Sequence, residues 1–323
     1  MTRLALFNPT SLLGKELIER LDRRPELWSD LALLSLDEDE IGALTDAAGA
    51  AAVVQRAEAA VIADADVLVV CGAAALYRDL VAGRAAESTL VLLDPLADDP
   101  AAHPVVAGLN SEQAFAGRVL SSPHPGTVLL AHLLAPLLPF EVEDVVATLV
   151  QPASLFERAG LDELFAQAGR LIALQGQEES EIFGGQLAFN LYPASRPPGG
   201  FADPVRRVLG IAEAPGFPLA AHLLQGGVFH GISALLHVRL GKTIAAGEVR
   251  RVLAGNPAIE LTETGAGHLG PIDAAADDAV LVGTVEQDSE GGLWIWAVMD
   301  NLTRGGAANA IGVVEQVLAT TVH

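Results

Sequence analysis

Short, continuous apolar runs are the feature that most constrains how the first 120 residues can fold. A run without polar alternation is typical of a strand that is buried on both faces of a parallel sheet. Helical stretches separate the runs, and Gly14 to Leu21 places Leu17, Ile18 and Leu21 on one helical face. The runs are Arg3–Phe7, Leu31–Leu36, Val67–Cys71, Thr89–Leu93 and Arg118–Leu120. This alternation predicts an α/β domain, with a Rossmann-like parallel sheet covered by helices on both faces.

The pattern changes after about residue 140, where the apolar segments become longer and are often separated only by turns. Residues 142–150 and 161–174 are expected to form a strand and a helix. Further strands are expected at 226–240, 257–262, 279–285 and 293–299, and a helix at 305–322. We therefore predict a Rossmann-like domain over residues 1–125 and a second α/β domain with a mixed sheet over 126–304. A C-terminal helix, 305–323, is expected to pack back on the first domain.

Composition and charge exclude several classes of function. The chain is 51% hydrophobic and carries 19 basic against 41 acidic residues, a net charge of −22. An acidic chain of this kind is a poor partner for nucleic acid or an anionic membrane. A single cysteine and no Cys/His cluster argue against a disulfide framework and a metal site. The N-terminus has no signal-peptide pattern and no apolar run is long enough to span a bilayer, so we expect a cytoplasmic protein.

The first strand, turn and helix have the order that binds a dinucleotide pyrophosphate on backbone N–H groups. Only Gly14 is a glycine among the close-approach positions, because Asn8 and Ser11 occupy the other two. Asn8 tolerates a positive φ and Ser11 is small, so a weak nucleotide site and a purely structural turn are both open. Asp37 follows the second strand, where a carboxylate can hold a ribose 2′-hydroxyl and repel a 2′-phosphate, which favours NAD over NADP.

Several segments together resemble a known family. They are Asn8-Pro-Thr-Ser-Leu-Leu-Gly14, Ser122-Pro-His-Pro-Gly-Thr127, Gln186-Leu-Ala-Phe-Asn-Leu-Tyr-Pro193, Val228-Phe-His-Gly-Ile-Ser233 and Asp300-Asn-Leu-Thr-Arg-Gly305 followed by Asn309. In this order the chain resembles the aspartate-semialdehyde dehydrogenase family along nearly its whole length. It is most similar to a divergent bacterial branch known as Usg proteins.

The resemblance implies a chemistry whose reagents are missing here. Family members reductively dephosphorylate aspartyl phosphate with NADPH through a thioester on a cysteine at a helix N-terminus, where the thiolate is favoured. That cysteine falls on Pro125, and the acid/base histidine falls on Ile232. The substrate-carboxylate arginine falls on Gln225 and the phosphate-side arginine within Ala97-Asp98, while Gln151 matches the family. The resemblance therefore implies a catalytically defective relative with a binding or scaffolding role.

The resemblance also implies where a weakly bound NAD or NADP would lie and how the chain assembles. The cofactor-binding residues are expected to be Thr10, Ser11, Leu12, Leu13, Gly14, Asp37, Cys71, Gly72 and Asn301. Cys71 takes the place of a serine in the family's cofactor loop, and a packing role for it is the alternative. A homodimer formed through the second domain is implied, with a small molecule or nucleotide as ligand and no metal.

Other interpretations remain open from the residues. An active oxidoreductase acting on aspartate semialdehyde or another small carbonyl substrate needs only a bound nicotinamide and a proton donor such as His124 or His230. His230 is expected on the same strand face as Ile232, and His124 also suits a role in stabilising the turn. A subunit that regulates an active paralogue is a further alternative. Four large aromatic residues are expected to be either core or interface residues: Phe201, Phe217, Trp294 and Trp296.

Overall fold

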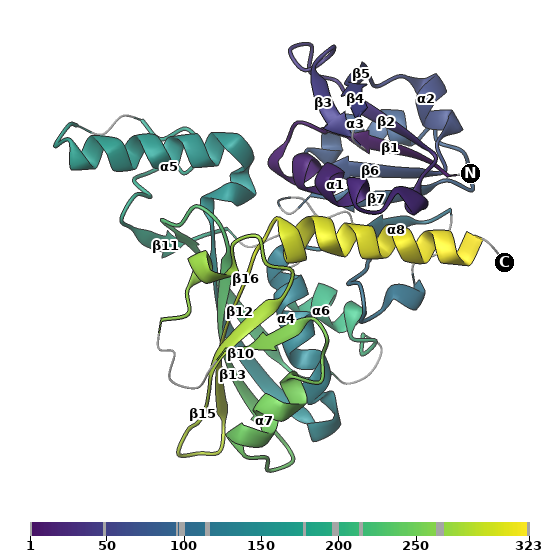
Figure 1. Cartoon of the computed structure of the whole chain (residues 1–323). Helices are drawn as coiled ribbons and strands as arrows, with labels where there is room; N and C mark the ends of the chain where they lie inside the picture. Colours follow the sequence, from purple (N-terminus) through teal and green to yellow (C-terminus); the bar gives the residue numbers. More distant parts are fainter. Residues whose placement is uncertain are drawn as a thin grey trace. The chain divides into compact units, whose positions relative to one another are not determined.

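The computed structural model describes residues 2–47, 50–94, 96, 101–113, 117–176, 179–195, 200–212, 216–262 and 268–321 (Figure 1). The chain divides into two compact units, and each is described by itself. Unit 1 joins Met1–His124 with Gly306–His323, and unit 2 is Pro125–Gly305.

Unit 1 is built on a parallel sheet in the order β5-β2-β1-β6-β7-β9-β8. Its strands are β1 (Arg3–Phe7), β2 (Asp30–Ser35), β5 (Gln55–Arg56), β6 (Val67–Cys71), β7 (Thr89–Leu93), β8 (His103–Pro104) and β9 (Val119–Ser121). Every pairing is parallel, as the continuous apolar runs predicted. The strand order reverses between β1 and β6, and ligands of such sheets bind at the carboxyl ends of the strands beside that point.

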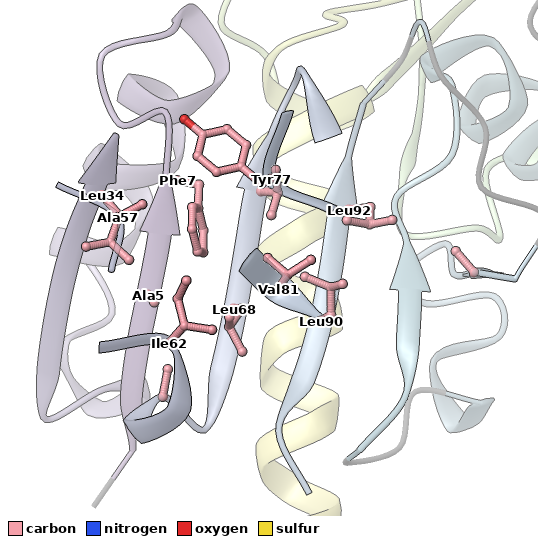
Figure 2. Close-up of a cluster of buried hydrophobic side chains, with 13 residues drawn as sticks. Ala5, Phe7, Leu34, Ala57, Ile62, Leu68, Tyr77, Val81, Leu90 and Leu92 are labelled. Carbon is pink, nitrogen blue, oxygen red and sulfur yellow. The ribbon is translucent and has the colours of Figure 1, made fainter. Parts of the chain in front are cut away.

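Helices cover both faces of this sheet. They are α1 (Leu12–Asp22), α2 (Ala59–Asp64), α3 (Ala74–Val81) and α8 (Ala308–Thr321), with short 3₁₀ turns at Pro25–Leu27 and Ser111–Gln113. Figure 2 shows the cluster beneath α2 and α3, where Phe7, Leu68 and Tyr77 pack with α8 behind the strands. Phe7 and Tyr77 meet edge to face at 5.0 Å between ring centroids. The predicted Rossmann-like fold is confirmed.

An alanine-rich stretch forms a β-hairpin that the sequence analysis did not predict. It is formed by β3 (Leu44–Ala47) and β4 (Ala50–Val53), which pair antiparallel. Alanine has little β propensity, so neither an apolar run nor a period of two marked these strands.

Unit 2 contains a mixed sheet in the order β11-β12-β10-β13-β16-β15-β14, as predicted. The strands are β10 (Val142–Gln151), β11 (Leu191–Pro193), β12 (Leu219–Gly226), β13 (Ile232–Leu240), β14 (Ile259–Leu261), β15 (Val280–Gln287) and β16 (Leu293–Met299). Strand β10 pairs parallel with β12 and antiparallel with β13.

The helices of unit 2 include one that is buried along its whole length. They are α4 (Pro125–Leu134), α5 (Glu157–Ile172), α6 (Ala202–Val208) and α7 (Ala246–Leu253). Helical turns lie at Ala135–Phe140, Ala153–Phe156, Pro271–Ala274 and Thr303–Ala307, the last of them π-helical. All 10 residues of α4 are buried, which explains why its sequence is apolar without a helical period.

The single strand expected over 226–240 is wrong, because the chain leaves the sheet between β12 and β13. The carbonyls of Val228 and Phe229 accept hydrogen bonds from Ala153 N and Ser154 N instead of continuing a strand ladder. Gly231 has φ +84°, and a Cβ there would lie 2.7 Å from Pro271 O. His230 therefore lies in the connection before β13 and does not share a strand face with Ile232.

Among the described helices, none is long and apolar enough to cross a bilayer.

Candidate functional site

The loop from β1 to α1 lies at the carboxyl edge of the unit 1 sheet, and hydrogen bonds of its own side chains hold its conformation. Asn8 has φ 56°, a left-handed conformation that asparagine tolerates. Ser11 caps α1, since its Oγ accepts from Gly14 N at 2.9 Å and donates to Asn8 O at 2.8 Å. A Cβ on Gly14 would lie 2.2 Å from Asn8 O. Thr10 and Leu12 are half-buried and Leu13 is buried. Glycine is thus required only at position 14.

Asn8 bridges β1 to the loop after β6, across the point where the strand order reverses. Its Nδ2 donates to Cys71 O at 2.9 Å and to Gly72 O at 3.2 Å, and its Oδ1 accepts from the Tyr77 hydroxyl. Burial raises the pKa of Tyr77, and the nearby carboxylates of Glu40 and Asp37 raise it further. Tyr77 therefore remains a neutral donor that supports Asn8.

The loop after β6 continues this edge of the sheet. Gly72 has φ 67° and Ala73 has φ 48°, so two successive residues are left-handed before α3 begins. The first amide of α3, Ala74 N, donates to Asp94 Oδ2 at 3.0 Å. Cys71 is the last residue of β6 and is 1% exposed. The structure thus places Cys71 in the core and Gly72 at the turn.

The acidic segment after β2 contributes one carboxylate to the β1–α1 loop. Glu40 accepts from the Thr10 hydroxyl and, through Oε2, from Ser35 Oγ at 2.7 Å. Asp37 is exposed, and its Oδ1 accepts from Asp39 N at 3.0 Å. Of the acidic residues that follow β2, Glu40 is the one held against the loop.

In unit 2, the start of α4 is packed against apolar atoms. Pro125 is buried as the first residue of the helix. A Cβ on Gly305 would lie 2.8 Å from Pro125 Cβ and 2.9 Å from Met299 Cε, so these side chains converge. Ile232 is 0% exposed and pairs with Met299 across β13 and β16.

Gln151 and Gln225 form a closed polar pair at the ends of adjacent parallel strands. They are directly opposite each other in the register of β10 and β12. Gln151 Nε2 donates to Gln225 Oε1 at 2.8 Å, and Gln225 Nε2 donates to Gln151 O at 3.2 Å. Both are at most 3% exposed. The pair is neutral and mutually satisfied.

Asn301 binds protein groups of unit 2. Its Oδ1 accepts from Gly231 N at 2.9 Å, and its amide exchanges hydrogen bonds with Ser154 Oγ. The neighbouring Asp300 accepts from Leu302 N and Thr303 N. These contacts give both residues a structural part in ordering the chain after β16.

The remaining predicted positions include two histidines. His124 is 7% exposed and His230 is half-buried. The described ranges contain no group of His, Cys, Asp and Glu side chains arranged to hold a metal ion. Ala97-Asp98 lies outside the described residues.

Comparison with known proteins identifies the relatives, although no family model matches the chain. Aspartate-semialdehyde dehydrogenase 2 of Vibrio cholerae is 27% identical over 97% of this chain and 96% of that protein. A USG-1 protein homolog of Azotobacter vinelandii is 28% identical over 97% of this chain and 96% of its own. The solved structure of a probable aspartate-semialdehyde dehydrogenase from Pseudomonas aeruginosa has a TM-score of 0.86 at 25% identity, with 98% of both chains covered. The chain is similar in sequence and fold to aspartate-semialdehyde dehydrogenases and to USG-1 proteins.

The fold likeness extends to an aspartate-semialdehyde dehydrogenase whose structure was solved with a nucleotide. The enzyme of Candida albicans, crystallised with NADP, has a TM-score of 0.73 at 15% identity over 100% of this chain and 99% of that one. At this identity the comparison shows a shared architecture, which in this chain includes the parallel sheet with its β1–β6 reversal.

The resemblance to aspartate-semialdehyde dehydrogenases points to individual positions in the sequence. It does not show which distant residues those positions contact in the structure. The contacts of Asn8 with Tyr77, of Glu40 with Thr10, and of Asp94 with Ala74 N join residues that are 20 to 69 positions apart. The sequence carries two signals for this site, an asparagine at a glycine position and an acidic run after β2. Neither signal says which carboxylate reaches the loop.

Proposed function

We propose that this chain is a catalytically defective homologue of aspartate-semialdehyde dehydrogenase with a binding or scaffolding role. The observation that carries the proposal is Pro125, buried at the start of α4 among apolar atoms, where the resemblance implies a nucleophilic cysteine. Proline has no atom that can attack a carbonyl. The one thiol of the chain, Cys71, is buried in the sheet of unit 1.

The other positions implied by the resemblance support the same proposal. Ile232 cannot move a proton, and it is fully buried. Gln225 stands where the resemblance implies an arginine for the substrate carboxylate, and a neutral amide already paired with Gln151 offers no charge-assisted clamp. The nucleophile, the acid/base residue and the cationic clamp are all replaced. These positions therefore have no positive charge to attract an anionic acyl substrate and no group to react with it.

Nucleotide binding by unit 1 is the second part of the proposal. It is supported by the β1–α1 and β6–α3 loops at the carboxyl edge of the sheet and by the fold shared with an enzyme solved with NADP. Thr10 to Gly14, Asp37 and the Gly72 turn would face the dinucleotide, and Cys71, buried at the end of β6, would support that turn from the core. Binding would be weak, because Asn8 and Ser11 have side chains at positions where glycine allows close backbone approach.

Loss of turnover is the first expected result. The purified chain should not support phosphate-dependent oxidation of aspartate semialdehyde with NAD or NADP, since no thiolate can form the thioester. The measurement is cofactor reduction at 340 nm, with an active aspartate-semialdehyde dehydrogenase as the positive control. Turnover at ordinary enzyme rates, about 1 to 1,000 per second, would contradict the proposal.

We also propose that the chain forms a homodimer through the outer face of the mixed sheet. Val146, Leu235 and Trp294 are 47%, 39% and 41% exposed there. They lie on the adjacent strands β10, β13 and β16, where Val146 pairs with His237 and His237 with Trp294. Large exposed apolar side chains grouped on one face of a sheet are typical of an interface between protein chains.

Charge on this face should dissociate the dimer. Leu235→Glu is expected to convert a species with the mass of two chains into a monomer, because a symmetric interface would bury the new carboxylate in both copies. Light scattering after size exclusion measures the mass. Leu76→Glu is the matched control, since Leu76 is a 71% exposed leucine on α3 in unit 1. A monomeric wild-type chain would refute the assignment.

A further inference from the structure

Glu40 is a carboxylate of unit 1 that is fixed beside the β1–α1 loop. One of its oxygens accepts from the Thr10 hydroxyl, and the other accepts from Ser35 Oγ at 2.7 Å. Ser35 is fully buried at the end of β2 and also accepts from Asp37 N at 3.0 Å. Two donors, Thr10 in the β1–α1 loop and Ser35 at the end of β2, therefore hold Glu40 beside the carboxyl ends of β1 and β2.

Each carboxylate oxygen of Glu40 can accept a further hydrogen bond beside the β1–α1 loop. A carboxylate has about four lone-pair directions, and one is used on each oxygen. A ribose 2′-hydroxyl can donate to such an acceptor. A 2′-phosphate cannot donate when it is ionised, and its charge repels a carboxylate at contact distance.

The neighbouring basic side chain is engaged by another member of the acidic segment. Arg56, on β5, donates from Nη2 to both oxygens of Glu38 at 2.5 and 2.6 Å. This ion pair is exposed, so it is a weak one. It nevertheless places the positive charge against Glu38 and leaves the carboxylate of Glu40 next to Thr10.

We propose that Glu40 selects NAD over NADP by accepting from the adenosine ribose and excluding a 2′-phosphate. The inference rests on the proposed nucleotide binding and names the residue that sets its specificity. It differs from the sequence expectation for Asp37, because Asp37 is exposed and its Oδ1 is occupied by the amide of Asp39. Thr10 and Ser35 act as positioning residues for Glu40.

The test compares dissociation constants for NAD and NADP by calorimetry in four proteins: wild type, Glu40→Gln, Asp37→Asn and Asp39→Asn. The wild type should bind NAD at least about tenfold more tightly than NADP, since like-charge contact is costly. Glu40→Gln keeps the size of the side chain and an acceptor for Thr10, and it should reduce the preference to within about threefold. Asp39→Asn removes an equal charge from the same exposed segment and should preserve the preference.

Each outcome decides the proposal. An NAD preference that survives in Glu40→Gln, or one that is lost in Asp37→Asn and not in Glu40→Gln, overturns the role of Glu40 while leaving nucleotide binding intact. A wild-type chain that binds neither nucleotide refutes nucleotide binding itself and this inference with it. Thermal melting of all four proteins distinguishes altered recognition from a failure to fold.

Discussion

Replacing Gly14 with alanine should lower the free energy of unfolding by about 3 kcal/mol, at the upper end of the cost of overpacking. The new Cβ would lie 2.2 Å from Asn8 O and 2.9 Å from Pro9 Cα, well inside contact distance of backbone atoms. Asn8 cannot retreat freely, because its amide binds Cys71 O and its backbone carbonyl binds Ser11. Relief therefore requires the whole β1–α1 loop to move.

The measurement is chemical denaturation of Gly14→Ala and of a matched glycine variant. Gly169 lies within α5, where a Cβ would meet no atom within 4 Å. Alanine there should raise the free energy of unfolding by about 1 kcal/mol, through its better helix propensity. Equal effects at the two positions would show that the β1–α1 loop is not tightly packed around Gly14.

The sequence predicted those parts of the fold whose burial leaves a local pattern of residues. The strands of unit 1 were recognised because residues such as Val67–Cys71 are buried on both faces and form continuous apolar runs. The hairpin of β3 and β4 was missed because its alanines have no such signature. The break between β12 and β13 was missed because it depends on hydrogen bonds from Ala153 and Ser154, which are distant in sequence.

Residues of the candidate site could be proposed from the sequence, but their hydrogen-bond partners could not. The missing thiol at Pro125 can be read directly from the residues once the resemblance is accepted. That Gln151 meets Gln225 depends on the register of β10 against β12, and that Glu40 reaches Thr10 depends on how the acidic segment turns back. Both are tertiary arrangements for which the chain has no local signal. Hydrogen-bond partners 30 or more residues apart are of this kind.

His132 should make the protein sensitive to acid. It lies in α4 and is 1% exposed, and its Nε2 has no hydrogen-bond partner among the described residues. Burial lowers the pKa of His132 to about 3, and the positive charge of Arg304 contributes in the same direction. The folded protein therefore keeps this imidazole neutral at pH values where an unfolded chain, with a pKa near 6.5, takes up a proton.

The sign of the effect follows from proton uptake. Above about pH 6.5 both states hold a neutral ring, so His132 adds no pH dependence. Below that pH only the unfolded state binds the proton, and the free energy of unfolding falls by up to about 1.4 kcal/mol per pH unit until the folded-state pKa is reached. Between pH 7 and pH 4.5 this group alone should remove about 3 kcal/mol.

Denaturation curves at pH 7 and pH 4.5 isolate this contribution when the wild type is compared with His132→Leu. Leucine suits a helix that is buried throughout, and Asn256 keeps its hydrogen bond to the backbone carbonyl of residue 132. Other groups titrate equally in both proteins, so the variant should lose about 3 kcal/mol less than the wild type on acidification. His268→Gln, at an exposed histidine, should follow the wild type. If His132→Leu loses as much stability as the wild type, the ring must be protonated in the folded state, and α4 must then admit a charge that its apolar surroundings disfavour.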